Sequence, residues 1–316
     1  MTQPATVIPD QLRPINPTQD LLAIADLLEN AFQLQNDPEA HLIIERMRQS
    51  TPWLPSAWGE GYVWESAGKI VGNLSLLPFY DGLKRIRLIA NVAVQDEFRH
   101  RGIAKRLTMR AIHHCRAIGV QKIFLQVSHN NPIAQQLYHE LNFHHLHSIA
   151  IWQLPANSNT PHQKPSSTTN EQIKPRPFSA WQTQKNWLQS NYPISTRWYN
   201  TVNIHEFSPW AWLNPFAWEQ TCWTEHFTLY DNNQTQGILS WVHRPNQKQS
   251  LWLATSPTPN QTQDDQRVNI LINKFLEDYW NRQALTLELP LGKHQKALQK
   301  LGFQLAHELD WMVYLP

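Results

Sequence analysis

The spacing of hydrophobic residues in the first half of the chain changes at well-defined points. Residues 85–94 alternate between apolar and polar and then become apolar throughout, which is typical of a largely buried strand. Between residues 104 and 118 the apolar positions recur every three or four residues and so share one helical face. Residues 122–128 again resemble a strand, and Asn131-Pro132 is typical of a helix start. The pattern predicts a β-α-β-α unit.

The turn between the first of these strands and the helix is basic and contains a glycine. A helix start carries unpaired N–H groups and the positive end of the helix dipole, and both attract an anion. Gly102 would let the backbone approach a phosphate closely, while Arg99, His100 and Arg101 add positive charge. These residues predict a pyrophosphate-binding turn, but a solvated basic turn in an ordinary β-α-β-α unit would carry them too.

A second motif gives the turn its context. The spacing Arg-x-x-Gly-x-Ala in residues 99–104 resembles the acyl-CoA pyrophosphate loop of the GCN5-related N-acetyltransferase (GNAT) superfamily. Residues 131–143 resemble the family's Asn-x-x-Ala-x-x-Leu-Tyr-x-x-x-Gly-Phe signature, with Asn142 in place of the glycine. Asn is the next most tolerant residue for a left-handed helix end. The resemblance implies the GNAT fold, an α/β fold with a mixed, mostly antiparallel central sheet flanked by helices.

The resemblance also implies acetyl-CoA as the co-substrate. In this family a bulge splays the strands, and the strand backbone pairs with the pantetheine arm. Tyr138 would be the catalytic general acid that protonates the departing thiolate, although its apolar helix face equally suits a core aromatic. The implied acetyl-CoA-binding residues are Val92, Ala93, Val94, Arg99, His100, Arg101, Gly102, Ile103, Ala104 and Asn131.

The general base is left unassigned. Many family members carry a glutamate just before the Val-x-Val of the motif strand, where this chain has Asn91. An amide cannot take up a proton, although it can orient a water or accept a hydrogen bond. Glu65 in an early strand and His129 at a strand end are the other candidates, and a lone histidine there is also typical of the surface.

Composition narrows the class of protein. The chain has 316 residues and a formal net charge of +2 with mixed signs, which gives no bulk electrostatic case for nucleic acid or membrane binding. There is no signal-peptide pattern or bilayer-spanning stretch, and the two cysteines, Cys115 and Cys222, do not indicate a disulfide framework. The paired histidines lack a third ligand on one face, so no metal is expected. We therefore expect a soluble, cytoplasmic protein, with homo-oligomerisation left open.

A change of composition divides the chain. Residues 155–177 are rich in Pro, Ser, Thr, Asn and Gln and contain one large aliphatic residue, Ile173, so they are predicted to be an extended linker. The predicted domains are therefore residues 1–154, an N-terminal GNAT acetyltransferase domain, and residues 178–316.

The second half repeats the pattern of the first. Predicted strands at 237–243, 250–255, 285–289 and 309–315 and helices at 265–282 and 293–301 follow the same order. The turn before the long helix contains neither glycine nor arginine, and Asp264 and Asp265 would repel a pyrophosphate there. Leu298 stands where Tyr138 would be. We therefore expect a degenerate GNAT-like copy that does not bind CoA productively.

Tryptophan is concentrated in the second half. Five tryptophans crowd one segment, at positions 198, 210, 212, 218 and 223. Stacking on a planar or sugar-like ligand would explain such density, and so would core or domain-interface packing. In the first half, Trp53 and Trp58 would wall an apolar or aromatic acceptor.

Taken with the resemblance, the residues predict an acyl-CoA-dependent N-acetyltransferase. It would transfer acetyl from acetyl-CoA to a primary amine by direct attack, with the acceptor left open. The alternative is a non-catalytic acetyl-CoA-binding regulator or scaffold, which Asn91 keeps open. A third option is a related donor such as a longer acyl-CoA or an aminoacyl group.

Overall fold

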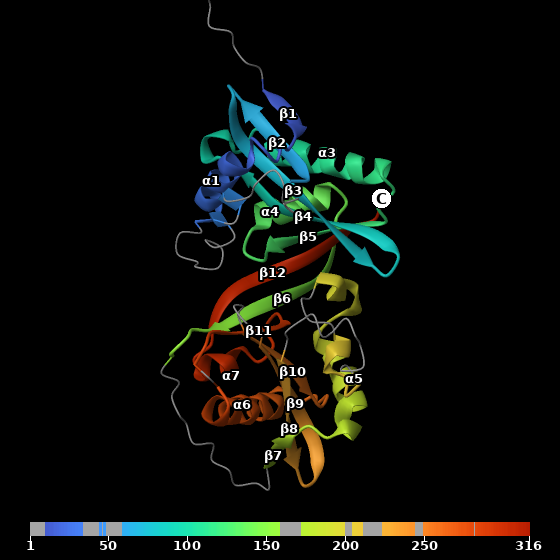
Figure 1. Cartoon of the computed structure of the whole chain (residues 1–316), viewed down its shortest axis with the longest axis vertical. Helices are drawn as coiled ribbons and strands as arrows, with labels where there is room; N and C mark the ends of the chain where they lie inside the picture. The colour runs from blue at the N-terminus through green and yellow to red at the C-terminus, as the bar shows by residue number, and fades with distance from the viewer. Residues whose placement is uncertain are drawn as a thin grey trace, which may run out of the picture. The chain divides into compact units, whose positions relative to one another are not determined.

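The structure is a computed structural model of the chain, and its secondary structure falls into two compact units (Figure 1). It describes residues 10–33, 44–45, 47–48, 59–158, 172–199, 204–210, 223–243, 249–280 and 282–316. The first unit comprises residues 1–146 together with 310–316, and the second comprises residues 147–309. The last seven residues of the chain therefore belong with its N-terminal part.

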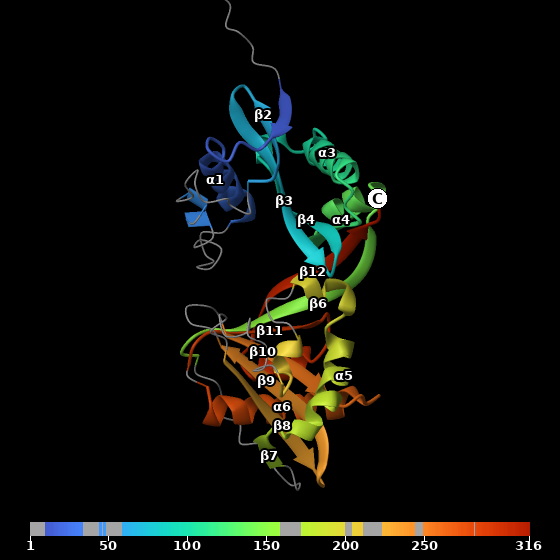
Figure 2. The same cartoon turned by 45° about the vertical axis from the view of Figure 1, so that its right-hand side comes forward.

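The first unit is a sheet with helices on both faces. Its elements are β1 (Gln11–Pro14), α1 (Leu21–Phe32), β2 (Gly61–Ser66), β3 (Lys69–Asp81), β4 (Lys84–Val94), the 3-10 turn η2 (Asp96–Phe98), α3 (Ile103–Ala117), β5 (Lys122–Ser128), α4 (Pro132–Glu140), the start of β6 (His144–Leu154) and the end of β12 (Gln304–Tyr314). The strand order is β1-β2-β3-β4-β5-β12. Strands β1 to β4 are antiparallel, and β4 and β5 are parallel. Figure 2 shows α1 on one side of β3 and β4 and α3 on the other.

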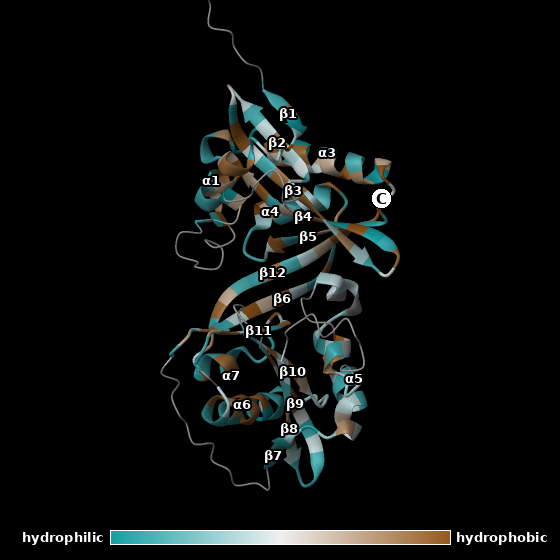
Figure 3. Cartoon of the chain, in the orientation of Figure 1, coloured by the Kyte–Doolittle hydropathy of each residue, from teal (hydrophilic) through white to brown (hydrophobic). Residues whose placement is uncertain are grey.

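Two apolar clusters form the core of this unit. Against one face of the sheet, α1 packs on Val63, Ile70 and Ala93. Against the other, α3 and α4 pack with Leu107 and Tyr138 among the buried residues. The apolar face predicted for residues 104–118 is therefore the buried side of α3, and brown and teal residues share that helix in Figure 3.

The second unit repeats this plan. Its elements are the end of β6, β7 (Gln172–Pro175), the 3-10 turn η3 (Phe178–Ala180), α5 (Trp181–Asn191), the 3-10 turns η4 (Ile194–Tyr199) and η5 (Ile204–Phe207), β8 (Trp223–Asp231), β9 (Gln234–His243), β10 (Gln249–Thr255), α6 (Gln261–Asp278), β11 (Leu285–Pro290), α7 (Gln295–Lys300) and the start of β12. The strand order is β6-β11-β10-β9-β8-β7, and β10 and β11 are parallel, as β4 and β5 are. The mixed, mostly antiparallel α/β fold in two copies is confirmed.

Several boundaries differ from those predicted. Helix α6 begins at Gln261, four residues earlier than expected, because the Asn260 side chain accepts hydrogen bonds from the next turn and caps the helix. Part of the predicted linker is the strand β7, whose Ile173 packs against the core of the second unit. The compact units also divide the chain within β6, because residues 149–154 pair with β11. The predicted domain limits at 154 and 178 stay a prediction.

Within the described part of the chain, no helix has both the length and the apolar character needed to cross a membrane.

Candidate active site

Strands β4 and β5 diverge at their C-terminal ends. Their parallel ladder runs from Ile86↔Lys122 to Ile89↔Leu125, whereas β4 continues to Val94 and β5 to Ser128. Beyond the ladder, the backbone of β4 no longer has β5 as its hydrogen-bonding neighbour. The backbone N–H and C=O groups of β4 beyond the ladder are therefore not paired with β5. A peptide-like ligand can form strand-type hydrogen bonds with such groups.

A β-bulge lies at the same place. Asn73 of β3 pairs with Ala93, but Ser75 pairs with Ala90. Between these two pairs β4 therefore contains one residue more than β3. Asn91, within the bulge, has a left-handed φ of 55°. A bulge bends its strand and leaves the extra residue out of the ladder. The bulge that the family resemblance implied is thus found, at the residue that replaces the usual glutamate.

The turn into α3 has the conformation expected of an anion-binding helix start. Gly102 caps α3 with a left-handed φ of 75°, and a Cβ added there would meet nothing within 4 Å. Glycine is therefore required by the backbone and not by crowding. The first helical hydrogen bond runs from the N–H of Arg106 to the Gly102 carbonyl, so the preceding N–H groups point out of the helix start.

The two arginines of the turn are exposed and already have partners. The Arg99 guanidinium lies 2.6 Å from Asp96, and its Nε donates to the Val94 carbonyl. Arg101 donates to the Glu97 carbonyl and lies over the Phe98 ring. A phosphate would therefore have to replace Asp96 as the partner of Arg99, a competition that the sequence analysis did not weigh.

Helix α4 follows the second motif closely. The Asn131 side chain caps the helix by accepting a hydrogen bond from the Ala134 N–H at 3.0 Å. Asn142 ends it with a left-handed φ of 64°, so asparagine does serve in place of glycine. Tyr138 is 6% exposed and meets Phe143 edge to face, with ring centroids 5.8 Å apart. Burial raises the pKa of Tyr138 to about 12, so the phenol is protonated at neutral pH, as a general acid must be.

Glu65 is a poor general base because it is already neutralised. Its carboxylate accepts a hydrogen bond from Arg13 at 2.8 Å, and Arg13 also pairs with Asp20. Arg13 and Lys69 are the cations, and Asp20, Asp26, Glu65, Asp96 and Glu97 the carboxylates, that line a cavity of about 720 Å³ beside α1. Two of these carboxylates have a further cationic partner, since Asp96 pairs with Arg99 and Asp26 with Arg48.

His129 is held in place by a residue that sequence reasoning missed. Its Nδ1 lies 3.0 Å from the buried carboxylate of Asp310 in β12, which also accepts a hydrogen bond from Gln135 at 2.9 Å. Gln135 donates to the His129 carbonyl as well, so the three residues clamp the turn between β5 and α4. From Asn131 to Tyr138 the helix rises about 10 Å. His129 therefore lies at the opposite end of α4 from Tyr138, which disfavours it as the base.

Comparison with known proteins identifies the family. Residues 22–143 match the family of GNAT acetyltransferases. These residues belong to the GNAT family. A chloroplastic relative from Arabidopsis thaliana, GCN5-related N-acetyltransferase 6, is 35% identical over 63 residues, which are 20% of this chain and 22% of the relative. The chain thus aligns with about a fifth of that relative's length.

Two solved structures extend the likeness to both units. A GNAT protein from Sphaerobacter thermophilus has a TM-score of 0.57 at 11% identity and covers 97% of this chain and 95% of its own. A tandem GNAT protein from the clavulanic acid biosynthesis pathway has a TM-score of 0.53 at 12% identity, covering 97% and 98%. At such identities the likeness shows the fold alone.

In the second GNAT-like unit, the matching strand edge is occupied by side chains of the chain itself. The ladder between β10 and β11 ends at Leu251↔Leu287, although β10 runs on to Thr255. Two residues past the ladder, the Leu253 N–H donates to the Tyr192 hydroxyl at 3.3 Å and the Leu253 carbonyl accepts from Asn191 Nδ2 at 2.8 Å. The end of α5 therefore occupies the backbone groups with which a pantetheine arm would pair.

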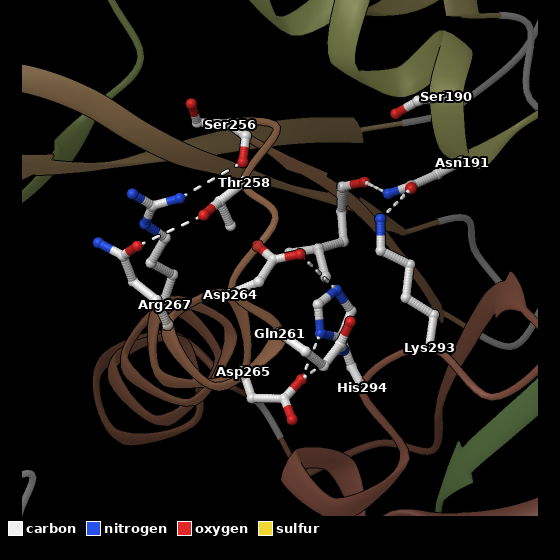
Figure 4. Close-up of polar contacts among 12 residues, drawn as sticks. Ser190, Asn191, Ser256, Thr258, Gln261, Asp264, Asp265, Arg267, Lys293 and His294 are labelled. Atoms are coloured by element: carbon white, nitrogen blue, oxygen red, sulfur yellow. Dashed lines mark hydrogen bonds and ion pairs between the residues drawn. The ribbon is translucent and has the colours of Figure 1, made fainter.

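The helix start of this unit is occupied too (Figure 4). The ring of His294 lies between two carboxylates, with Nδ1 2.7 Å from Asp265 and Nε2 3.4 Å from Asp264. Lys293 beside it donates to the Asn191 side chain at 2.7 Å. Burial lowers the pKa of His294, which is 1% exposed. Two carboxylates and a buried histidine thus stand at the helix start that faces a pyrophosphate in GNAT proteins.

The other expectations from the sequence have mixed outcomes. Among the described residues, no group of three or more His, Cys, Asp or Glu is placed to hold a metal ion. Trp53, Trp58, Trp212, Trp218 and Cys222 lie outside the described residues. Elsewhere in the second half, the described tryptophans at 241, 252 and 311 are buried core residues, whereas those at 210 and 223 are each 67% exposed.

Proposed function

We propose that this protein is an acetyl-CoA-dependent N-acetyltransferase whose N-terminal unit transfers acetyl to a primary amine. The observation that carries the proposal is the divergence of β4 from β5 at the bulge around Asn91, next to a helix start capped by Gly102. Such a strand edge suits a pantetheine arm, and such a helix start suits a pyrophosphate. Both are available in the first unit, and both are occupied in the second.

The proposal includes a set of cofactor contacts. Val92, Ala93 and Val94 of β4 would pair with the pantetheine arm. The turn made by Arg99, His100, Arg101, Gly102, Ile103 and Ala104 would hold the pyrophosphate, and Asn131 would border the arm from the start of α4. Because two basic side chains of the turn are exposed, they are free to turn toward a phosphate at modest cost.

The chemistry requires no covalent enzyme intermediate. The amine nitrogen attacks the thioester carbon, and the tetrahedral intermediate collapses as the carbon–sulfur bond breaks. Tyr138 gives its phenolic proton to the departing thiolate, and the proton released from the attacking nitrogen is lost to solvent, from which the phenolate is reprotonated. The products are the N-acetyl amine and CoA thiol.

For the acceptor amine, we propose only its charge. The cavity beside α1 is lined by five carboxylates and two cations, and this acidic lining favours amines that carry further positive charge, such as polyamines or aminoglycosides. We infer a cytoplasmic location, where acetyl-CoA is supplied. The second candidate function is an acetyl-CoA-binding regulator, which the lack of a carboxylate at Asn91 favours.

The test is release of CoA thiol from acetyl-CoA in the presence of a polyamine, an amino acid, an aminoglycoside or a lysine-containing peptide. We expect amine-dependent release, and we expect Tyr138→Phe to lower kcat by about 10²-fold with little change in affinity for acetyl-CoA. Phenylalanine keeps the packing on Phe143. Tyr192→Phe, at a buried tyrosine of the second unit, is the matched control and should leave kcat unchanged. Binding without amine-dependent release would instead identify the regulator.

A further inference from the structure

A buried asparagine holds the β4 bulge. Asn73 of β3 is fully buried, and its Nδ2 donates to the carbonyl of Asn91 at 2.8 Å. Ser75, two residues along β3, lies 3.4 Å from the side-chain nitrogens of both asparagines. The extra residue of a bulge lies outside the ladder, so its carbonyl needs a donor from elsewhere. Asn73 supplies that donor.

The amide of Asn73 is only half satisfied. Its Oδ1 is buried and has no hydrogen-bond partner within the described part of the chain. Turning the amide over would place Oδ1 against the Asn91 carbonyl oxygen, so the orientation is fixed by the bond that Nδ2 makes. A leucine of similar size would avoid the unsatisfied oxygen but would leave the Asn91 carbonyl without its donor. A buried amide that is only half satisfied calls for an explanation, and the bond that it makes to the bulge supplies one.

Asn73 and Tyr138 act on opposite faces of the sheet. Along β3, Asn73 alternates with Leu74, which packs in the core under α3 and α4 together with Tyr138. Asn73 therefore points to the α1 face, where its pairing partner Ala93 packs. A thioester at the bulge would thus have the acid for its sulfur on one face, and the incoming amine would approach from the face that carries Asn73.

The second unit offers a parallel with a different outcome. There Asn191 donates to the carbonyl of Leu253 at the same distance, 2.8 Å, and Leu253, like Asn91, stands two residues past the end of a parallel ladder. In that unit the neighbouring N–H is also taken, by Tyr192. In the first unit the donor to the strand carbonyl comes from the neighbouring strand β3, and the side-chain contacts of the described residues include no tyrosine at the matching N–H.

We propose that Asn73 is a positioning residue for acetyl transfer. By holding the Asn91 carbonyl it keeps the β4 bulge in one conformation, and so fixes the neighbouring backbone groups that receive the thioester. The proposal rests on the proposed function, since it concerns the same site. Asn73 does not touch the reacting atoms; it acts through the backbone of β4.

Asn73→Leu is the main test, with Asn191→Leu as the matched control. We expect Asn73→Leu and its control to lose a similar amount of stability, because each leaves a strand carbonyl without its side-chain donor. Only Asn73→Leu should lower kcat/KM for the amine reaction, by about 10²-fold, because misplacing reacting groups by about 1 Å has that effect. The Asn191→Leu variant loses an equivalent bond in the second unit and should keep kcat/KM within about twofold. A kcat/KM for Asn73→Leu that matches the control would overturn the proposal.

Asn73→Asp gives a readout that a purely structural role would not change. A buried carboxyl has a raised pKa, and only its protonated form can donate to the Asn91 carbonyl. The ratio of variant to wild-type kcat/KM should therefore rise as the pH falls, and a ratio independent of pH would count against the proposal. If the wild type binds acetyl-CoA but accepts no amine, the proposed function fails separately. Calorimetry then decides: weaker acetyl-CoA binding in Asn73→Leu but not in Asn191→Leu supports the role of Asn73, and equal binding overturns it.

Discussion

Glu288 allows a stability prediction with a defined sign and size. It follows Leu287, the last residue of the β10–β11 ladder, and pairs with Ile151 of β6. Burial raises the pKa of its carboxyl from 4.5 to about 7. In the first unit the residue after the end of the ladder is Gln126, which carries no charge. Glu288→Gln therefore places in β11 the same neutral residue that β5 has at the matching position.

The sign follows from proton binding. Between pH 4.5 and about 7 the unfolded chain has released the Glu288 proton while the folded chain still holds it, so stability falls as the pH rises through this window. Above it, the folded protein carries a buried carboxylate. The difference between 4.5 and about 7, at 1.36 kcal/mol for each pH unit, gives about 3 kcal/mol as the upper limit of this cost. Glu288→Gln should remove most of it.

The assay is denaturant unfolding of the wild type and Glu288→Gln, each measured at about pH 4, 6 and 8. We expect equal stability near the lowest pH and a gain of about 1–3 kcal/mol for the variant at the highest. Glu140→Gln is the control, because hydrogen bonding to Lys105 lowers the pKa of this exposed carboxyl and its removal should bring no gain at high pH. A gain for Glu288→Gln that is the same at every pH would refute the reasoning.

Two further predictions concern the candidate site. Titration of the intact chain with acetyl-CoA in a calorimeter should reach saturation at one equivalent, because Asn191 and Tyr192 already occupy the strand edge of the second unit; a second equivalent would show that this edge can open. Asp310→Ala removes the acceptor shared by His129 and Gln135 and should cost about 1–3 kcal/mol of stability, with weaker acetyl-CoA binding near Asn131. Unfolding and binding curves that match the wild type would show that the clamp is not needed.

The parts of the fold that sequence predicts well are those set by local chemistry. The buried face of α3, the Asn131 cap and the left-handed ends at Gly102 and Asn142 each depend on neighbours within one or two helical turns. The divergence of β4 and β5 and the bulge were expected only through the family resemblance. Periodicity alone could not give them, because a bulge adds one residue without changing the residue types around it.

The parts that were missed depend on residues far apart in the chain. His129 and Asp310 are 181 positions apart, and Asn191 and Leu253 are 62 apart. Their pairing depends on strand order, which no local pattern encodes. The strand β7 was assigned to a linker because a four-residue edge strand needs few apolar residues, and Ile173 is the large aliphatic residue it contributes to the core. Asp310 could have been noticed as a carboxylate within an apolar strand end.

The two halves differ in what satisfies the strand edge that β4 and β10 each present. In the second half the chain supplies its own donor and acceptor, so the edge is stable without a ligand. In the first half the side chain of Asn73, from the neighbouring strand β3, holds the Asn91 carbonyl, and the edge of β4 beyond its ladder with β5 is the part that we propose pairs with a ligand. The last residues of the chain belong to the first unit, where the buried side chains of Met312 and Tyr314 at the end of β12 complete the core that contains Tyr138. A chain cut after the first half would therefore lose part of the core beneath the proposed acid, which gives a physical reason for the two units to stay on one chain.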